Sequence, residues 1–349
     1  MTTTTTTGAD LGRRTFLSLA ATGIASATVA VRAQQAVAVA PRIRIPSAPA
    51  GRWAGHQPGK VYLGMSTPST ITAAEAATGR TGVHRTFHTW DGAPRELTMI
   101  RANHASGHLP WISFKPPGGA ASWSAIASGQ HDAALRQRAL GYASLKQPVV
   151  VTFHHEPTND SDDGAAFAAA WTRIYDVMTQ TASLKHVSMV PIIGDWAFNP
   201  RNKASRPEAF LPDGVLQRMA FLGIDCYQNA SGETLGERLD RIHGWMGERG
   251  FGAKMLGVGE TGATELFGSP TAVQWWSSSW GWVTANTDKV GVVSYFNSTR
   301  NSKADVHWAF DESTAKLAAF KKSLVTSQAC RLTGASTTPG GRPGFRKNR

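Results

Sequence analysis

Two short apolar stretches of this 349-residue chain end in ionisable side chains. The first starts with four consecutive β-branched residues from Val149 and ends in His154, His155 and Glu156. The second, KMLGVGETGA, ends its apolar run at Glu260. A run without a polar alternate face is typical of a parallel strand that is buried on both faces. Charges at the end of such a strand are costly unless they are paired or used, so we expect Glu156 and Glu260 to face each other across one pocket.

Polar and aromatic residues follow the other predicted strands in the same way. Carboxylates beside aromatic rings suit a glycoside site, because acid–base chemistry acts on the bridging oxygen and flat rings bind the faces of sugars. Lys115 and Asp225 also end strands, and Asp225 either supports the site or is paired inside the sheet. The candidates for substrate binding are His88, Trp90, Asp195, Trp196, Tyr295 and Asn297.

Strand and helix patterns alternate from Lys60 onward. The strand candidates number eight, at Val61–Met65, Val83–Phe87, Leu109–Phe114, Val149–Phe153, Val187–Ile193, Phe221–Cys226, Met255–Gly259 and Val290–Phe296. Helical patterns lie between and after them, at Thr70–Thr78, Pro94–Ala105, Asp132–Leu145, Ala165–Thr181, Leu235–Arg249, Thr271–Ala285 and Glu312–Leu324. The interval from Asp195 to Arg218 holds three prolines and predicts a long loop with a short helix.

Eight strand-then-helix units predict an α/β protein, a single (β/α)8 TIM barrel over residues 60–327, because this fold typically needs about 250 residues. Function in such a barrel sits at the C-terminal ends of the strands, where the residues named above fall. The alternative, an open doubly wound sheet, requires a glycine-rich phosphate turn, and Gly118 and Gly119 fit no such motif.

The composition is that of a globular protein, with 41% hydrophobic and 17% charged residues. The net charge of +12 comes mainly from the two ends of the chain, since residues 1–59 and 331–349 together carry 11 basic and 1 acidic side chains. Residues 60–330 hold 25 basic against 23 acidic side chains, which argues against a nucleic-acid-binding face. The same part contains no apolar run of about 18 residues, so it predicts no transmembrane helix.

Residues 1–33 are typical of a twin-arginine (Tat-type) signal peptide, because Arg13 and Arg14 precede a mildly apolar run that ends in small residues near Ala33. An N-terminal membrane anchor is the alternative reading of this run. Residues 34–59 have the composition of a linker, and residues 328–349 that of a basic disordered tail. We therefore expect a secreted protein without a stable membrane anchor. A monomer is a separate expectation.

The two glutamate stretches resemble those of the clan A glycoside hydrolases, and most closely those of glycoside hydrolase family 26, which includes β-mannanases. In that family a His-Glu pair after the fourth strand supplies the general acid/base. A Glu after the seventh strand is the nucleophile, and a Tyr after the sixth strand hydrogen-bonds to it. The resemblance assigns these roles to His155 with Glu156, to Glu260 and to Tyr227.

The chain departs from the pattern of that family at two places. Asn-Gly commonly follows the acid/base shortly after it, whereas the residues from Pro157 to Asp160 read PTND. A Trp often lies near the end of the eighth strand, where this chain has Tyr295 and Phe296. These differences bear on the substrate more than on the chemistry.

The resemblance implies a double displacement on a polysaccharide. Glu156, kept protonated, would donate a proton to the leaving oxygen, Glu260 would attack the anomeric carbon, and Glu156 would then activate a water. Retaining enzymes place the two carboxyls roughly 5–5.5 Å apart, and we expect that separation here. β-Mannan is the first expected substrate, with xylan, β-glucan or a cell-wall glycan as alternatives.

Other functions are open alternatives. A non-catalytic polysaccharide-binding barrel would not need two opposed glutamates, and an esterase would require a G-x-S-x-G motif that the sequence lacks. His154 and His155 point to opposite faces of an extended strand, so His154 is expected to be structural. We expect no cofactor and no metal, because no second His follows at the spacing of a zinc protease. Cys226 and Cys330 either form one bridge or remain free.

Overall fold

The structure, a computed structural model, describes residues 52–202, 206–299, 308–310 and 313–333. The predicted signal peptide, residues 34–51 of the predicted linker and the tail from residue 334 lie outside the described residues. In the part of the chain that is described, no helix is long and apolar enough to cross a membrane.

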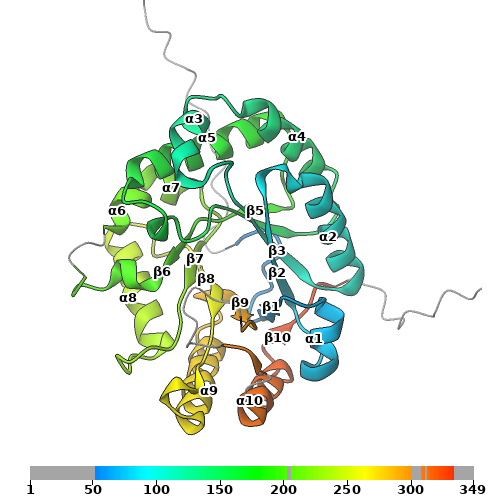
Figure 1. Ribbon diagram of the computed structural model, residues 1–349, viewed down its shortest axis with the longest axis vertical. Coiled ribbons are helices and arrows are strands. Elements are labelled where there is room, and N and C mark those ends of the chain that lie inside the picture. The colour runs from blue at the N-terminus through cyan, green and yellow to red at the C-terminus, as the bar shows by residue number, and fades with distance from the viewer. Residues whose placement is uncertain (1–51, 203–205, 300–307, 311–312, 334–349) are drawn as a thin grey trace, which may run out of the picture. The chain divides into compact units, whose positions relative to one another are not determined.

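A parallel sheet forms a barrel, and the helices lie around its outside (Figure 1). The strands are ordered β5-β4-β3-β2-β1-β9-β8-β7-β6, with neighbours paired in parallel. Their bounds are β1 Val61–Ser66, β2 Val83–His88, β3 Leu109–Phe114, β4 Val149–Phe153, β5 Val187–Met189, β6 Ile192–Gly194, β7 Leu222–Asp225, β8 Leu256–Thr261 and β9 Val290–Phe296. Both faces of such a sheet are covered, which explains why its strands are apolar almost throughout.

The barrel closes between β5 and β6, which are consecutive in the chain and separated by Val190 and Pro191. The Val190 amide donates to Val151 O of β4 at 2.9 Å, and the Gly223 amide of β7 donates to Pro191 O at 2.9 Å. The two short strands therefore act as one interrupted strand, and the predicted (β/α)8 barrel is confirmed. The single fifth strand predicted over Val187–Ile193 is broken at a proline, which has no amide hydrogen to give to the ladder.

The helices lie close to their predicted positions. They are α1 Ile71–Thr78, α2 Ala93–Ser106, α4 Asp132–Ala143, α5 Gly164–Thr181, α8 Leu235–Glu248, α9 Ser269–Ala285 and α10 Thr314–Leu324. Three short helices add to these, namely α3 Trp123–Ala127, α6 Pro207–Phe210 and α7 Asp213–Arg218. Side-chain caps start several helices: Asp163 accepts from the Ala166 amide at α5, and Thr234 and Glu237 form a capping box at α8.

Residues that were predicted to lie outside the barrel cover its N-terminal end. Trp53, in the predicted linker, is buried, and its ring lies 5.1 Å from that of Phe221. In the predicted tail, β10 (Ala329–Cys330) pairs in parallel with β1. The packed part of the chain therefore extends beyond residues 60–327 at both ends. The two cysteines are both free.

Candidate active site

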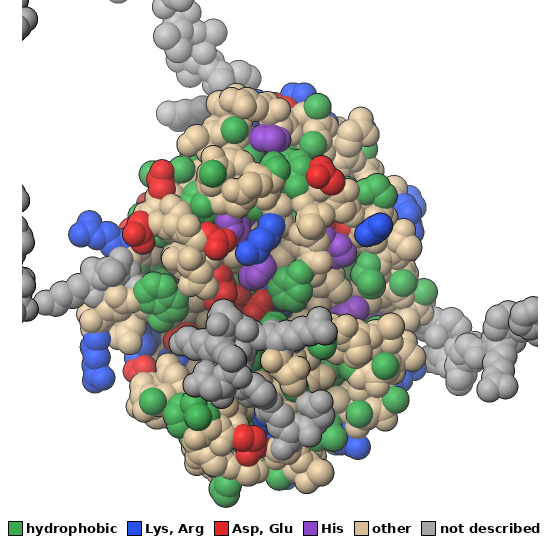
Figure 2. All heavy atoms as spheres, viewed as in Figure 1, with side chains coloured by type: hydrophobic (Ala, Val, Ile, Leu, Met, Phe, Trp, Pro, Cys, Tyr) green, Lys and Arg blue, Asp and Glu red, His purple; other side chains and the backbone are tan. Residues whose placement is uncertain are grey.

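A cavity of about 810 Å³ opens at the C-terminal ends of the strands, where a (β/α)8 barrel carries its function. Acidic side chains and histidines gather in a hollow near the middle of the face shown in Figure 2. Six of the predicted site residues line the cavity: His155, Glu156, Asp195, Trp196, Tyr227 and Glu260. The structure thus brings both predicted glutamates into one pocket.

The chain turns sharply after β4, and this turn presents Glu156. His154, with φ 44°, and Glu156, with φ 49°, are the non-glycine residues of the described part that have a left-handed backbone. Each such residue costs on the order of 1–3 kcal/mol and persists only where its surroundings enforce it, as at many active sites. The Glu156 amide donates to Ile192 O at 3.1 Å, and Asn159 Nδ2 donates to Glu156 Oε2 at 3.0 Å. These bonds fix the Glu156 side chain in the cavity wall.

The surroundings of Glu156 favour its protonated form. Loss of solvent around the carboxyl, and then the charge of Glu260, raises the pKa of Glu156 to about 7, although Arg85 and Lys115 act to lower it. His155 is neutral as well, because desolvation, followed by the charges of Arg85 and Lys115, holds the pKa of its ring well below the ordinary value. Glu156 can therefore serve as a proton donor near neutral pH and below.

Glu260 lies in β8 where the strand bulges. Ile224 pairs with Val258 and Asp225 pairs with Glu260, so Gly259 is an extra residue between the two pairs. A Cβ at Gly259 would lie 2.5 Å from Asp225 Oδ1, so only glycine fits there. Bulges next to active sites re-aim side chains, and this one turns Glu260 into the cavity.

Both carboxyl oxygens of Glu260 accept hydrogen bonds. Tyr227 Oη donates to Oε2 at 2.6 Å, and Arg85 Nη2 donates to Oε1 at 3.3 Å. Desolvation and the charge of Glu260 hold the pKa of Tyr227 well above its ordinary value, so its hydroxyl remains a donor. The two donors orient the carboxylate and stabilise its negative charge. The hydrogen bond expected between Tyr227 and Glu260 is therefore present.

Arg85 of β2 is a site residue that the sequence interpretation missed. Its side chain is buried, donates to Ser113 Oγ at 3.0 Å and lies 5.3 Å from the Trp111 ring. An arginine within a buried strand is itself a signal, because such a charge needs a partner. The partner, Glu260, is 175 positions away, and no spacing rule connects the two.

Asp225 places a third carboxyl group in the cavity wall. It is 2% exposed, and neither of its side-chain oxygens forms a hydrogen bond of ordinary geometry with the described residues. Burial raises the pKa of Asp225 well above its ordinary value, and the charges of Glu260 and Glu156 act in the same direction. A buried carboxyl without a partner is more favourable when neutral, so Asp225 adds a protonated group and not another negative charge.

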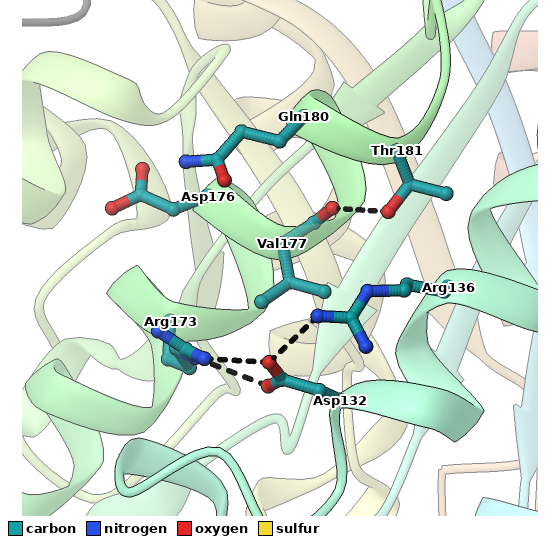
Figure 3. Close-up of a pocket in the computed structure, with 7 residues that line it drawn as sticks. All are labelled: Asp132, Arg136, Arg173, Asp176, Val177, Gln180 and Thr181. Carbon is teal, nitrogen blue, oxygen red and sulfur yellow. Dashed lines mark hydrogen bonds and ion pairs between the residues drawn. The ribbon is translucent and has the colours of Figure 1, made fainter.

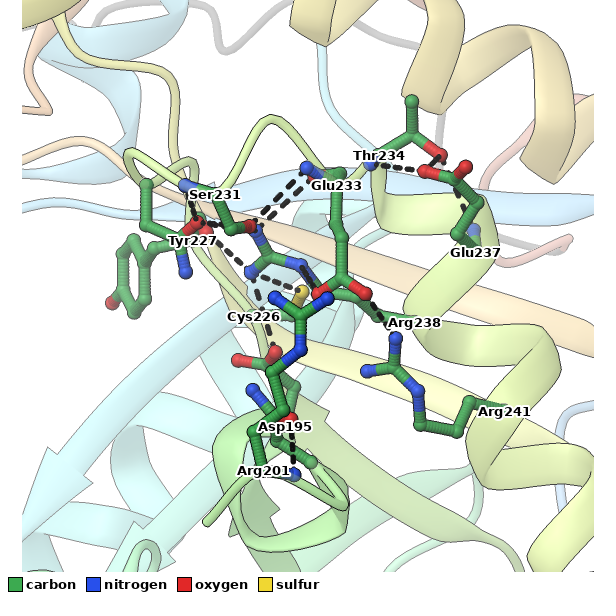
Figure 4. Close-up of polar contacts among 12 residues, drawn as sticks. Asp195, Arg201, Cys226, Tyr227, Ser231, Glu233, Thr234, Glu237, Arg238 and Arg241 are labelled. Atoms are coloured by element: carbon green, nitrogen blue, oxygen red, sulfur yellow. Dashed lines mark hydrogen bonds and ion pairs between the residues drawn. The ribbon is translucent and has the colours of Figure 1, made fainter.

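Arg238 of α8 joins two walls of the cavity (Figure 4). Its buried guanidinium donates to Asp195 Oδ2 at 3.2 Å, to Tyr227 O at 2.8 Å and to Asn229 Oδ1 at 2.8 Å. Desolvation raises the pKa of Asp195, and Arg238 opposes this effect. Arg238 thus ties the loop that carries Tyr227 to the end of β6. In the sequence, Arg238 occupies an ordinary polar position of a predicted helix.

Two tryptophans line the cavity. Trp196 directly follows β6 and is 40% exposed. Trp308, which was not predicted, lies with its ring 4.7 Å from that of Tyr227. The substrate contact predicted for Tyr295 is wrong, because this side chain is fully buried and its hydroxyl donates to Trp308 O at 2.8 Å. Tyr295 supports the Trp308 backbone instead.

The other predicted substrate-binding residues lie outside the lining of the cavity. Trp90 is buried, with the Arg138 guanidinium 5.7 Å from its ring, and packs in the core instead of binding a sugar. His88 is half-buried, and desolvation, then Arg138, lowers its pKa to about 4. Asn297 Oδ1 accepts from the Phe310 amide at 2.9 Å, so its side chain holds the backbone after β9.

A second cavity of about 290 Å³ lies outside the barrel, beside α4 and α5 (Figure 3). Arg173 donates to both oxygens of Asp132, at 3.1 and 2.5 Å, and Arg136 donates to Asp132 at 3.2 Å. Asp176 of the same lining is paired with Arg218, so these charged groups have partners, and they lie away from the strand ends. Across the described residues, no three His, Cys, Asp or Glu side chains are placed to hold a metal ion.

The chain shares its fold with glycoside hydrolases of known structure. A GH26 β-mannanase from Bacteroides ovatus gives a TM-score of 0.55 at 16% identity and covers 78% of this chain and 91% of its own. An endo-β-1,4-glucanase from Xanthomonas axonopodis pv. citri gives 0.52 at 14%, covering 75% and 98%. A fungal β-1,4-galactanase gives 0.52 at 12%, covering 75% and 99%. No protein-family model and no curated protein matches the chain. The resemblance to clan A glycoside hydrolases is confirmed at the level of the fold.

Proposed function

We propose that this protein is a retaining β-glycoside hydrolase that uses Glu156 and Glu260 in a double displacement. The observation that carries the proposal is the contrast between two carboxyl groups in one cavity. The surroundings of Glu156 favour its protonated form, while two hydrogen-bond donors stabilise the negative charge of Glu260. One group can therefore donate a proton while the other acts as nucleophile, as in retaining glycosidases.

In the first step Glu156 donates its proton to the oxygen that links two sugars, and Glu260 attacks the anomeric carbon. The bond to the leaving sugar breaks as a covalent ester forms between the other sugar and Glu260. Arg85 and Tyr227 hold the attacking carboxylate in place. The ester removes the negative charge that helps to raise the pKa of Glu156, so Glu156 stays ionised after it has given up its proton and is available as the base for the next step.

In the second step the Glu156 carboxylate takes a proton from a water molecule, and the water oxygen displaces Glu260 from the anomeric carbon. The sugar leaves with its original anomeric configuration, and both glutamates return to their starting states. The neutral ring of His155 places no positive charge beside Glu156, which preserves the protonated form for the next cycle.

The substrate that we propose first is β-mannan. Trp196 and Trp308 support a polysaccharide substrate, because aromatic rings in a cavity wall can bind the flat faces of sugars. The solved structures that share the fold include a β-mannanase, a β-1,4-glucanase and a β-1,4-galactanase. Xylan and β-glucan are accordingly the alternatives for the same chemistry.

The test is sugar release by residues 34–349 from β-mannan, xylan, β-glucan and chitin-type polymers, beside Glu156→Gln and Glu260→Gln. We expect the parent to cut one of these polymers and each variant to lose at least about a hundredfold in rate. Glu248→Gln, at an exposed position at the end of α8, is the matched control and should leave the rate unchanged. Activity that survives both substitutions would contradict the site. Binding without hydrolysis by the parent would indicate a non-catalytic polysaccharide-binding barrel.

We also propose that the protein is exported through a twin-arginine signal in residues 1–33. The support is the Arg13-Arg14 pair before a mildly apolar run, together with a polymeric substrate that has to be cut outside the cell. Fusing residues 1–33 to a reporter that works only after export tests this proposal. Replacing both arginines by lysine should abolish export, and export that persists in the double variant would contradict it.

A further inference from the structure

A hydrogen-bonded clip connects the turn after β4 with α3. It is made of Trp123 of α3, His154 and Asp160. We propose that His154 is a positioning residue, which joins Trp123 to Asp160 and thereby holds Glu156 in its left-handed conformation with its carboxyl in the cavity. This inference rests on the proposed function, in which Glu156 is the proton donor. Asp160 itself lines the cavity, so the clip connects the packing outside the barrel with the wall of the site.

The hydrogen bonds of the clip define one tautomer of His154. Trp123 Nε1 donates to His154 Nδ1 at 2.8 Å, and His154 Nε2 lies 2.5 Å from Asp160 Oδ2. An indole N–H can only donate, so Nδ1 carries the lone pair and Nε2 carries the hydrogen that is given to Asp160. The His154 ring is 0% exposed and lies 5.2 Å from the Trp123 ring. A neutral imidazole therefore satisfies both neighbours at once.

The charges around the clip favour the same arrangement. Burial lowers the pKa of His154, although Asp160 acts to raise it, and Lys115 lowers it further. Desolvation acts to raise the pKa of Asp160, but the His154 hydrogen bond and Lys115 bring it below the ordinary value. Lys115 Nζ lies 3.6 Å from Asp160 Oδ2. A neutral donor and a charged acceptor therefore face each other near neutral pH.

A substitution at His154 can act in two ways, by removing the hydrogen bonds of the clip or by changing how readily the residue adopts its backbone conformation. The choice of the new residue separates these two effects. His154 and Glu156 both have a left-handed backbone, which asparagine adopts more readily than histidine. An asparagine side chain reaches only as far as the Nδ1 position, whereas a glutamine amide can reach the Nε2 position and still bond to Asp160. His154→Asn thus relieves the backbone and loses the bond to Asp160, and His154→Gln keeps the bond to Asp160 without relieving the backbone.

The experiment compares His154→Gln, His154→Asn and His154→Phe with the parent by kcat and KM, and by a ¹³C NMR titration of the Glu156 carboxyl, assigned with Glu156→Gln. For Asn and Phe we expect kcat to fall about tenfold to a hundredfold with little change in KM, because a small misplacement of a catalytic group costs this much. The Glu156 pKa should fall toward its ordinary value as the carboxyl leaves its place facing Glu260, Arg85, Lys115 and Asp160. The Gln variant should stay close to the parent in both measurements.

Two further variants complete the design. His104→Phe is the matched control, because His104 is buried and its Nε2 bonds to Pro148 O at 2.8 Å, at the opposite end of β4. It should lower thermal stability without moving kcat or the Glu156 titration. Asp160→Ala breaks the clip from its solvent-exposed side, and it should reproduce the effect of His154→Phe even where a His154 variant fails to fold.

An unchanged kcat and Glu156 titration in His154→Phe and Asp160→Ala would overturn the inference, and so would a higher kcat in His154→Asn than in His154→Gln. If the parent hydrolyses none of the polymers, the proposed function fails on its own. The Glu156 titration then still decides whether the clip positions this carboxyl, because it needs no substrate.

Discussion

Glu156 and Glu260 carry the same side chain in one cavity but differ in what surrounds them. Glu260 accepts from a tyrosine hydroxyl and an arginine, whereas Glu156 has the Asn159 amide as a donor and faces the charge of Glu260. A carboxylate that has lost solvent without full compensation is unfavourable, so the proton stays on Glu156. The protonation of Glu156 therefore depends on the charge of Glu260.

Activity should fall as the pH rises through the pKa of Glu156. Because that pKa is raised to about 7, the proton donor is present below about pH 7 and lost above it. Lys115 acts to lower this pKa, so Lys115→Met should move the basic limb of the kcat/KM profile to higher pH. A profile for Lys115→Met whose basic limb stays in place or moves to lower pH would contradict this arrangement of charges.

Glu156→Gln should make the protein more stable at alkaline pH while it abolishes activity. The Glu156 pKa rises from 4.5 to about 7 on folding, so its contribution to stability is present below pH 4.5 and is lost as the pH rises through about 7. The resulting penalty is about 3 kcal/mol above that pH, and glutamine removes it. Thermal unfolding at about pH 4 and about pH 8 checks this, and a gain of equal size at both pH values would count against it.

At the scale of elements, a turn after β4, a bulge in β8 and a loop after β7 bring the site together. Arg238→Gln should lower both stability and kcat, because it removes the cation of partly buried Asp195 and releases the loop that carries Tyr227. Breaking one side of a buried ion pair costs about 3 kcal/mol or more. Arg241→Gln, which removes an ion pair with Glu233, should cost less than about 1 kcal/mol. Urea unfolding and kcat of both variants provide the test, and equal losses would contradict the role of Arg238.

The barrel and its two glutamates could be predicted because their signals are local. Most of the strands are apolar runs, and Glu156 and Glu260 stand where such a run ends. A strand-end position fixes the end of the barrel at which a residue lies. It does not fix whether the side chain points into the cavity, as Trp196 does, or into the core, as Trp90 and Tyr295 do. That choice depends on the path of the backbone after the strand.

Arg85 and Trp308 show two different reasons why a site residue escapes prediction. Arg85 stands in a predicted strand, and its partner is defined only when the barrel closes. Trp308 lies well beyond the end of β9, so no predicted strand end places it, and its contact with Tyr227 is a tertiary contact that the sequence pattern does not show. Hydrophobic periodicity indicates which face of a helix or strand is buried. It does not indicate which distant residues meet, as Arg85 meets Glu260 and Trp308 meets Tyr227.

At the scale of the whole barrel, the two ends have different roles, one functional and one structural. The C-terminal end carries the cavity, and the N-terminal end is packed around Trp53. Trp53→Ala should cost about 3–5 kcal/mol of stability, because it removes a large buried ring that contacts Tyr62 and Phe221. KM and the pH profile should stay those of the parent. A shift of the basic limb in this variant would contradict the separation of the two ends.

The covalent bond between Glu260 and a sugar is the most direct signature of the proposed chemistry. A 2-deoxy-2-fluoro glycosyl fluoride of the matching sugar slows the second step, so that the ester accumulates and can be located by mass spectrometry of peptides. We expect the added mass on the peptide that contains Glu260, and none on the Glu260→Gln variant. A label on Glu156 or another residue, or hydrolysis of the polymer by a parent that never takes up the label, would contradict the mechanism.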